Sequence, residues 1–180
     1  MTDHADRKEL LRIARAAVHA RVNGHRASDT PARGALARFA AAFATLHHAG
    51  KLRGCIGHVE ADRPLAQVVA DCAAAASTED PRFPPVTPDE LPSLCIELSI
   101  LGPFELVALL EEIAVGRHGL LVQLRRRRGL LLPQVATEWN WDRATFVEQT
   151  CLKAGLSHDA WQMGGATLWK FEAEVFGEDR

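Results

Sequence analysis

The sequence lacks the features that mark several large classes of protein. Its 21 basic and 23 acidic residues leave a net charge of −2, which gives no overall attraction to nucleic acid or to a membrane surface. No apolar run approaches the ~20 residues that span a bilayer. The N-terminal stretch is charged and amphipathic, unlike a secretory signal. We therefore expect a cytoplasmic protein that has no membrane partner.

The chain also lacks the short motifs of common catalytic and cofactor sites. It has no P-loop, GxGxxG, GxSxG or HExxH motif, and no CxxxCxxC triplet for an iron–sulfur cluster. Its four cysteines form no CxxC pair, so we expect free thiols in a reducing compartment. Cys72, Cys95 and Cys151 lie in apolar segments and are interpreted as small buried core residues. No metal and no cofactor are expected.

What is present predicts an α+β protein, in which helices and strands are interspersed and hairpins are frequent. Helical periodicity is found at residues 7–22, 62–72, 105–115 and 141–155. Strand patterns are found at residues 37–46, 51–60, 94–101, 119–124, 129–133 and 166–176. The hairpins favour a mixed or antiparallel sheet over a doubly wound parallel one. The proline-rich residues 81–92 indicate either a junction between lobes or a rigid loop.

The predicted strand KLRGCIGHVE, residues 51–60, contains two residues that strands usually exclude. Gly54 and Gly57 lower strand stability and bring no side chain to pack. They also leave bare backbone that a ligand or another chain segment can approach closely. Alternation along the strand predicts that Leu52 and Ile56 point into the core.

The same alternation places Arg53 and Cys55 on the opposite face, with α-carbons roughly 6.5 to 7 Å apart. A guanidinium in reach of the sulfur would stabilise the thiolate and lower the cysteine pKa. The alternative is a buried cysteine near a strand bulge, with Arg53 salt-bridged elsewhere. His58 points away from Cys55 in a regular strand, which argues against a shared metal.

Arg125–Arg128 form a basic run between two predicted strands. Such a run in a hairpin turn is typical of a solvated tip, although binding of nucleic acid or of an acidic protein partner stays open. The chain is slightly acidic and has no aromatic residues interleaved with the run, so nucleic acid is not the expected partner.

A series of sequence blocks resembles the AMMECR family, whose bacterial and archaeal members are called AmmeMemoRadiSam system protein A. The blocks are LRGCIG (52–57), RPLAQVVADCAAAA, DPRFPPVTPDEL (80–91), LCIELSIL, GRHGLLV (116–122), LLLPQVA (130–136), CLKAGL (151–156) and WKFEAEVF. They follow the family's order and cover about residues 36–176. Residues 1–35 contribute the predicted helix and a loop.

The resemblance implies one compact domain over residues 1–180, with a larger and a smaller lobe and a cleft that exposes LRGCIG. It also implies partners, because relatives are encoded with, or fused to, a Memo-type protein and a radical-SAM protein. It does not supply a reaction. The implied function is a component of that system acting on a small molecule through the cleft. The alternative is a non-catalytic adaptor or ligand-binding module.

Carried over position by position, the resemblance also implies a set of site residues. The catalytic candidates are Cys55, His118 and Glu97, and the substrate-binding candidates are Arg53, Gly54, Gly57, Arg82 and Lys153. In this scheme Cys55 attacks, His118 is the base, Glu97 orients it, and an arginine holds an anion.

Several of these residues also have a purely structural interpretation. Arg82 can pair with Asp80, and Glu97 can bond to Arg53 or Arg82. Lys153 can cap the last carbonyls of its helix. Spacing along the chain does not decide which of these residues meet, so whether the protein is an enzyme stays open.

Overall fold

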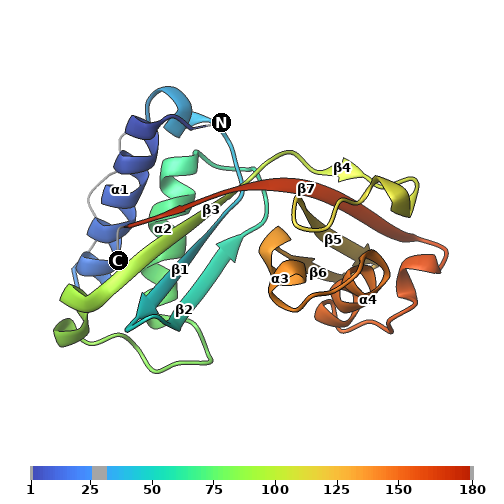
Figure 1. Ribbon diagram of the computed structural model, residues 1–180. Helices are drawn as coiled ribbons and strands as arrows, with labels where there is room; N and C mark the ends of the chain where they lie inside the picture. Colours follow the sequence, from blue (N-terminus) through green and yellow to red (C-terminus); the bar gives the residue numbers. More distant parts are fainter. Residues whose placement is uncertain (1, 26–31, 179–180) are drawn as a thin grey trace. The chain divides into compact units, whose positions relative to one another are not determined.

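The computed structural model describes residues 2–25 and 32–178 (Figure 1). The chain divides into two compact units: unit 1 contains Met1–Leu101 and Glu174–Arg180, and unit 2 contains Gly102–Ala173. The proline-rich residues 81–92 lie inside unit 1 and are therefore not a junction between the two units. The interpretation as a rigid loop is the one that stays. The predicted loop between the first helix and the first strand lies largely outside the described residues.

Unit 1 is built on antiparallel strands. Strand β1 (Ala42–His48) lies between β2 (Lys51–His58) and β3 (Leu94–Leu101), and the end of β7 (Ala166–Gly177) is next to β3. Helices α1 (His4–Val22) and α2 (Leu65–Thr78) pack on each other. Both lie along one side of the strands (Figure 1). Short 3₁₀ turns occupy Gly34–Ala37 and Pro88–Ser93.

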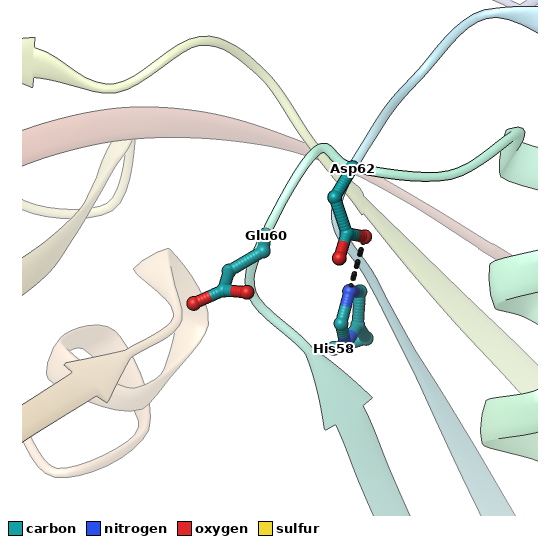
Figure 2. A group of neighbouring side chains, drawn as sticks. All are labelled: His58, Glu60 and Asp62. Carbon is teal, nitrogen blue, oxygen red and sulfur yellow. Dashed lines mark hydrogen bonds and ion pairs between the residues drawn. The ribbon is translucent and has the colours of Figure 1, made fainter.

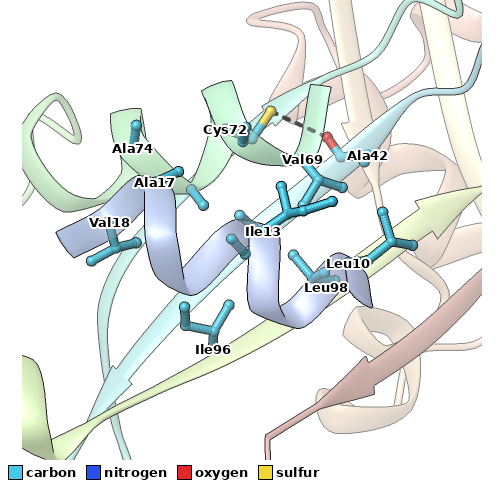
Figure 3. Packing of buried hydrophobic residues seen from close by; sticks show 14 of the residues in the cluster. Leu10, Ile13, Ala17, Val18, Ala42, Val69, Cys72, Ala74, Ile96 and Leu98 are labelled. Carbon is cyan, nitrogen blue, oxygen red and sulfur yellow. Dashed lines mark hydrogen bonds between the residues drawn. The ribbon is translucent and has the colours of Figure 1, made fainter. Parts of the chain in front are cut away.

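The core of unit 1 lies between these helices and one face of the strands. Figure 3 shows Leu10 and Ile13 of α1 beside Val69 of α2 and Leu98 of β3, all of them buried. Small residues such as Ala42 on the same face let the helices approach the strands closely. The other face of β1–β3 carries Thr45, Cys55 and Glu97 among its residues.

Unit 2 is also built on antiparallel strands and has its own core. Strands β4 (Glu105–Leu106) and β5 (His118–Leu124) pair with opposite edges of β7, and β6 (Arg127–Leu131) pairs with β5. Helices α3 (Pro133–Glu138) and α4 (Arg143–Lys153) complete the unit, with 3₁₀ turns at Leu110–Glu112 and Ala160–Gln162. Side chains of β5 and α4, including Leu120 and Phe146, are fully buried in this core.

The sequence-based prediction of a mixed α+β fold is confirmed, as are both hairpins, the last strand and the helix ending before Gly155, whose φ is +68°. The predicted helix over 105–115 is wrong. Its start pairs with β7, where the Val107 amide donates to the Leu168 carbonyl, and Leu106 and Leu109 are exposed. Pairing with β7 therefore overrides local helix propensity. No helix among the described residues is long and apolar enough to cross a membrane.

Candidate functional site

The LRGCIG segment forms the middle of β2, an edge strand of unit 1 that contains a bulge. In the pairing with β1, Leu46 lies opposite Gly54 and His47 opposite Leu52, so Arg53 is an extra residue on β2. A bulge re-aims the side chains next to it. Leu52 is 41% exposed and is not the core residue that alternation predicts, whereas Ile56 does pack against the core.

Arg53 fastens the proline-rich loop to β2. Its Nε donates to Glu90 Oε1 at 2.7 Å and its Nη2 to Glu90 Oε2 at 3.0 Å. Its two Nη groups also donate to the carbonyls of Pro84 and Pro85. The Arg53 guanidinium lowers the pKa of the Glu90 carboxyl to about 2. Arg53 thus donates its hydrogen bonds to the loop and not to the Cys55 sulfur. This agrees with the alternative interpretation of the sequence, in which Arg53 is salt-bridged elsewhere.

Gly54 and Gly57 are required by close packing of other parts of the chain. A Cβ on Gly54 would lie 2.1 Å from the Ala76 carbonyl oxygen, because α2 crosses β2 at this point. A Cβ on Gly57 would lie 2.1 Å from the ring of Phe43, its cross-strand neighbour on β1. The sequence predicts that either a ligand or another chain segment approaches these glycines. In the structure, another chain segment does so at both positions.

Asp80 and Arg82 pair with the backbone of Cys55 on the open edge of β2. The Cys55 amide donates to Asp80 Oδ2 at 2.8 Å, and Arg82 Nη2 donates to the Cys55 carbonyl at 3.5 Å. Arg82 also donates to both carboxylate oxygens of Asp80. Two side chains thus satisfy a donor and an acceptor that a neighbouring strand would otherwise satisfy.

This pair is electrostatically strong because its carboxylate is buried. Asp80 is only 4% exposed, while the Arg82 side chain is 55% exposed. The Arg82 guanidinium holds the pKa of the Asp80 carboxyl well below its usual range, and the bond from the Cys55 amide adds to this effect. The pair therefore keeps Cys55 in a fixed backbone position.

Cys55, Thr45 and Glu97 form a row across β2, β1 and β3 on the face opposite the helices. Thr45 is the direct partner of both other residues, so all three side chains share this face. The Thr45 hydroxyl donates to Cys55 Sγ at 3.3 Å. Glu97 is half-buried, and its carboxylate has no hydrogen-bond or ion-pair partner among the described residues. We call these residues the Cys55 row.

His118 and Lys153 belong to unit 2. The Ala114 amide donates to His118 Nδ1 at 3.0 Å, so the neutral ring carries its proton on Nε2. Burial lowers the pKa of His118, and the positive charges of Lys170 and Arg117 lower it further. The neutral imidazole therefore presents a donor, not a base, at its free nitrogen. Lys153 is exposed in the last turn of α4.

One group of described side chains has the composition of a cation site. The ligand atoms of His58, Glu60 and Asp62 lie within 4.8 Å of one another, at the end of β2 and in the segment that follows it (Figure 2). His58 Nε2 and Asp62 Oδ1 form a 2.7 Å hydrogen bond, which lowers the pKa of Asp62. Carboxylate oxygens and imidazole suit divalent cations. Cys55 is not part of this group.

Comparison with known protein families gives a match over most of the chain. The sequence model of the AMMECR1 family matches residues 11–176. The chain belongs to the AMMECR1 family.

Similar AMMECR1-family proteins occur in archaea. A protein of Methanothermobacter thermautotrophicus is 40% identical over 182 residues, covering 96% of this chain and 94% of the relative. MJ0810 of Methanocaldococcus jannaschii is 45% identical over 144 residues, covering 76% and 72%. A protein of Thermofilum pendens is 48% identical over 134 residues, covering 71% of this chain and 63% of the relative.

A solved structure has the same fold. The crystal structure of the uncharacterized protein PH0010 from Pyrococcus horikoshii superposes with a TM-score of 0.88 and 37% sequence identity. The match covers 94% of this chain and 90% of that chain.

Sequence reasoning missed Thr45, whose hydroxyl bonds to the Cys55 thiol. Placing the hairpin turn at Ala49–Gly50 would have revealed it, because that turn and the bulge set Thr45 opposite Cys55. It also missed the bond from the Cys55 amide to Asp80, although the pairing of Asp80 with Arg82 was an open alternative. Glu90 carried a signal as well, since it closes a capping box with Thr87.

Proposed function

We propose that the Cys55 row is the site at which this AMMECR1-family protein binds or transforms a small molecule, as a component of a system with Memo-type and radical-SAM proteins. One observation carries the proposal. A half-buried thiol receives a hydrogen bond from Thr45, while Glu97 in the same row has no partner among the described residues. A half-buried carboxylate without a protein partner is available to a ligand.

The row favours a ligand that has two different ends. Cys55 and Glu97 are two strands apart, which is about 10 Å between backbones, with Thr45 between them. A small molecule lying over Thr45 would place a thiol-reactive group at Cys55 and a cationic or donor group at Glu97. The guanidiniums of Arg53 and Arg82 are already bonded within the chain, which supports recognition of a cation over an anion.

Charge-matched thiol reagents test this proposal directly. We would treat the protein with cationic and anionic methanethiosulfonates. Each transfers its alkylthio group to a cysteine thiolate, which forms a mixed disulfide and releases methanesulfinate. Mass spectrometry would measure the rate at each cysteine. Cys95 is the internal reference: it is half-buried on the neighbouring row of the same face, and is not the buried core residue that the sequence predicts.

We expect Cys55 to react faster than Cys95, and faster with the cationic reagent than with the anionic one. Glu97→Gln should remove this preference. Thr45→Val should slow the reaction of Cys55 with both reagents, because Cys55 Sγ no longer accepts a hydrogen bond from the Thr45 hydroxyl. An inert Cys55, or a charge preference that survives in Glu97→Gln, would contradict the proposed site.

A second proposal, a non-catalytic adaptor for the Memo-type and radical-SAM proteins, has its own support. Much of the LRGCIG segment has a structural role, since Arg53 holds a loop and Gly54 admits α2. A pull-down with each partner protein tests it, and Cys55→Ser should then bind as well as the unaltered chain. Retention of neither partner would count against the adaptor.

A further inference from the structure

The turn between β5 and β6 places an arginine where the backbone favours glycine. Leu124 pairs with Arg127, so the turn contains only Arg125 and Arg126. Arg125 has a φ of +56°, in the left-handed region that costs a residue with a side chain some conformational energy. Glycine is the common residue at the first position of such hairpin turns. The chain therefore keeps a guanidinium at the tip at some cost in stability.

A recess of about 580 Å³ lies beneath this turn, inside unit 2. Leu124, Leu156 and the 53% exposed Met163 give it an apolar lining, and the arginines of the turn line it as well. The Arg127 guanidinium bonds to the Gly155 carbonyl. Those of Arg125 and Arg126 have no partner among the described residues, and no acidic side chain lines the recess.

We infer that this recess is a docking site for an acidic, apolar segment of a partner protein. Carboxylates of that segment would bond to Arg125 and Arg126, since guanidinium and carboxylate match in charge and in geometry. One or two of its apolar side chains would enter the recess against Leu124 and Leu156, and flexible Met163 would adapt to them. The site is separate from the Cys55 row and does not depend on the function proposed there.

The lining favours a protein segment over the other anionic partners. Single-stranded nucleic acid is held by aromatic side chains that stack on bases, and the lining contains none. A membrane would be entered by protruding apolar side chains, whereas Leu124 and Leu156 are only partly exposed in a concave surface. Exposed arginines beside a concave apolar lining complement a protein segment in which carboxylates alternate with leucines.

Fluorescence anisotropy with three labelled peptides of equal length tests the inference on the whole chain. The first alternates leucine and glutamate, the second has lysine in place of glutamate, and the third has serine in place of leucine. Only the first should bind, with a Kd on the order of tens of micromolar, as for a small transient interface. Anionic lipid vesicles and a single-stranded oligonucleotide are the two further probes.

The strained turn provides a variant that removes charge without harming the fold. Arg125→Gly suits the observed φ, so its thermal midpoint should be unchanged or higher, while binding falls. Adding Arg126→Ser should weaken binding about tenfold in total, since each exposed charge pair contributes modestly. Arg117→Gln, a 71% exposed arginine elsewhere in unit 2, is the matched control and should leave binding unchanged. Reversing both charges, Arg125→Glu with Arg126→Glu, should select the lysine peptide instead.

The outcomes separate cleanly. Selective binding of the leucine–glutamate peptide that is lost in Arg125→Gly supports the docking site. Equal binding of the serine–glutamate peptide would show general charge attraction and overturn it. So would no binding of any peptide, or tighter binding of vesicles or oligonucleotide through the same arginines.

Discussion

Replacing Asp80 by asparagine removes one negative charge from unit 1 and hardly changes the volume of the side chain. The carboxylate is 4% exposed and accepts hydrogen bonds from the Cys55 amide, the Arg82 amide and two guanidinium nitrogens of Arg82. Asparagine keeps one acceptor oxygen and turns an NH₂ group towards these donors. At least two charge-assisted hydrogen bonds are lost. Arg82 compensates for part of this loss by forming hydrogen bonds with water. The net loss of unfolding free energy should be about 3 kcal/mol.

The pH dependence of this loss has a defined sign. Arg82 depresses the pKa of Asp80 in the folded protein, so the stabilisation is complete above the unfolded carboxyl pKa of ~3.9. It disappears as the pH falls towards the folded pKa. The difference between Asp80→Asn and the unaltered chain should thus be constant from about pH 7 to pH 5 and shrink below about pH 4.

The assay must report on the unit that is changed. The chain has four tryptophans and no tyrosine, and Trp139, Trp141, Trp161 and Trp169 all lie in unit 2. Intrinsic fluorescence therefore follows unit 2, whereas far-UV circular dichroism includes α1 and α2 of unit 1. Urea titrations should be read by both signals. A shift in circular dichroism alone would show that the two units unfold separately.

Asp71→Asn is the matched control, because Asp71 pairs with Arg63 on the surface and is 54% exposed. It should change the unfolding free energy by less than about 1 kcal/mol. If Asp80→Asn is as mild as this control, or if its effect does not shrink in acid, the proposed role of the Asp80–Arg82 pair in holding β2 is wrong.

Three further predictions test other contacts in the two units. Gly54→Ala should lower the unfolding free energy by about 3 kcal/mol in urea titrations, because the new methyl group meets the backbone of α2; Gly57→Ala should cost less, since the Phe43 ring can turn away. Arg53→Gln should return the pKa of Glu90 from about 2 towards its ordinary value and should speed proteolysis within residues 81–92. Neither effect should occur in the control Arg12→Gln, which changes an exposed ion pair. With iodoacetamide near pH 8, Cys72 and Cys151 should be the last cysteines to react in the folded protein. The reason is that burial raises the pKa of both thiols, that of Cys72 to about 12. Early labelling of either thiol would contradict its burial in the structure.

Much of the fold follows from local sequence patterns. The alternation in LCIELSIL and the sharp stop at Gly155 place β3 and the end of α4 within a residue or two. The helix expected over 105–115 fails because its local preference for helix is overruled by pairing with β7, which lies some 60 residues further along the chain. Local periodicity carries no information about such a distant partner.

The candidate site is less accessible to sequence reasoning for a related reason. Alternation assumes an unbroken strand, and the bulge at Arg53 breaks it, which exposes Leu52 and turns Arg53 to the loop. Whether Arg82 pairs with Asp80 or binds an anion depends on where the loop folds back. The Cys55 row becomes visible only when three strands are in register.

Strand β7 has a consequence for how the protein is made. Its last residues and those just after it close unit 1: Glu174 bonds to Thr2 and Arg7, and Glu178 bonds to Arg15 and to the Ile96 amide. The ribosome must first synthesise residues 102–173, so α1 and β3 wait about 4 to 14 s for these partners. During that interval unit 2 can fold as a continuous segment, while unit 1, although it begins first, is completed last.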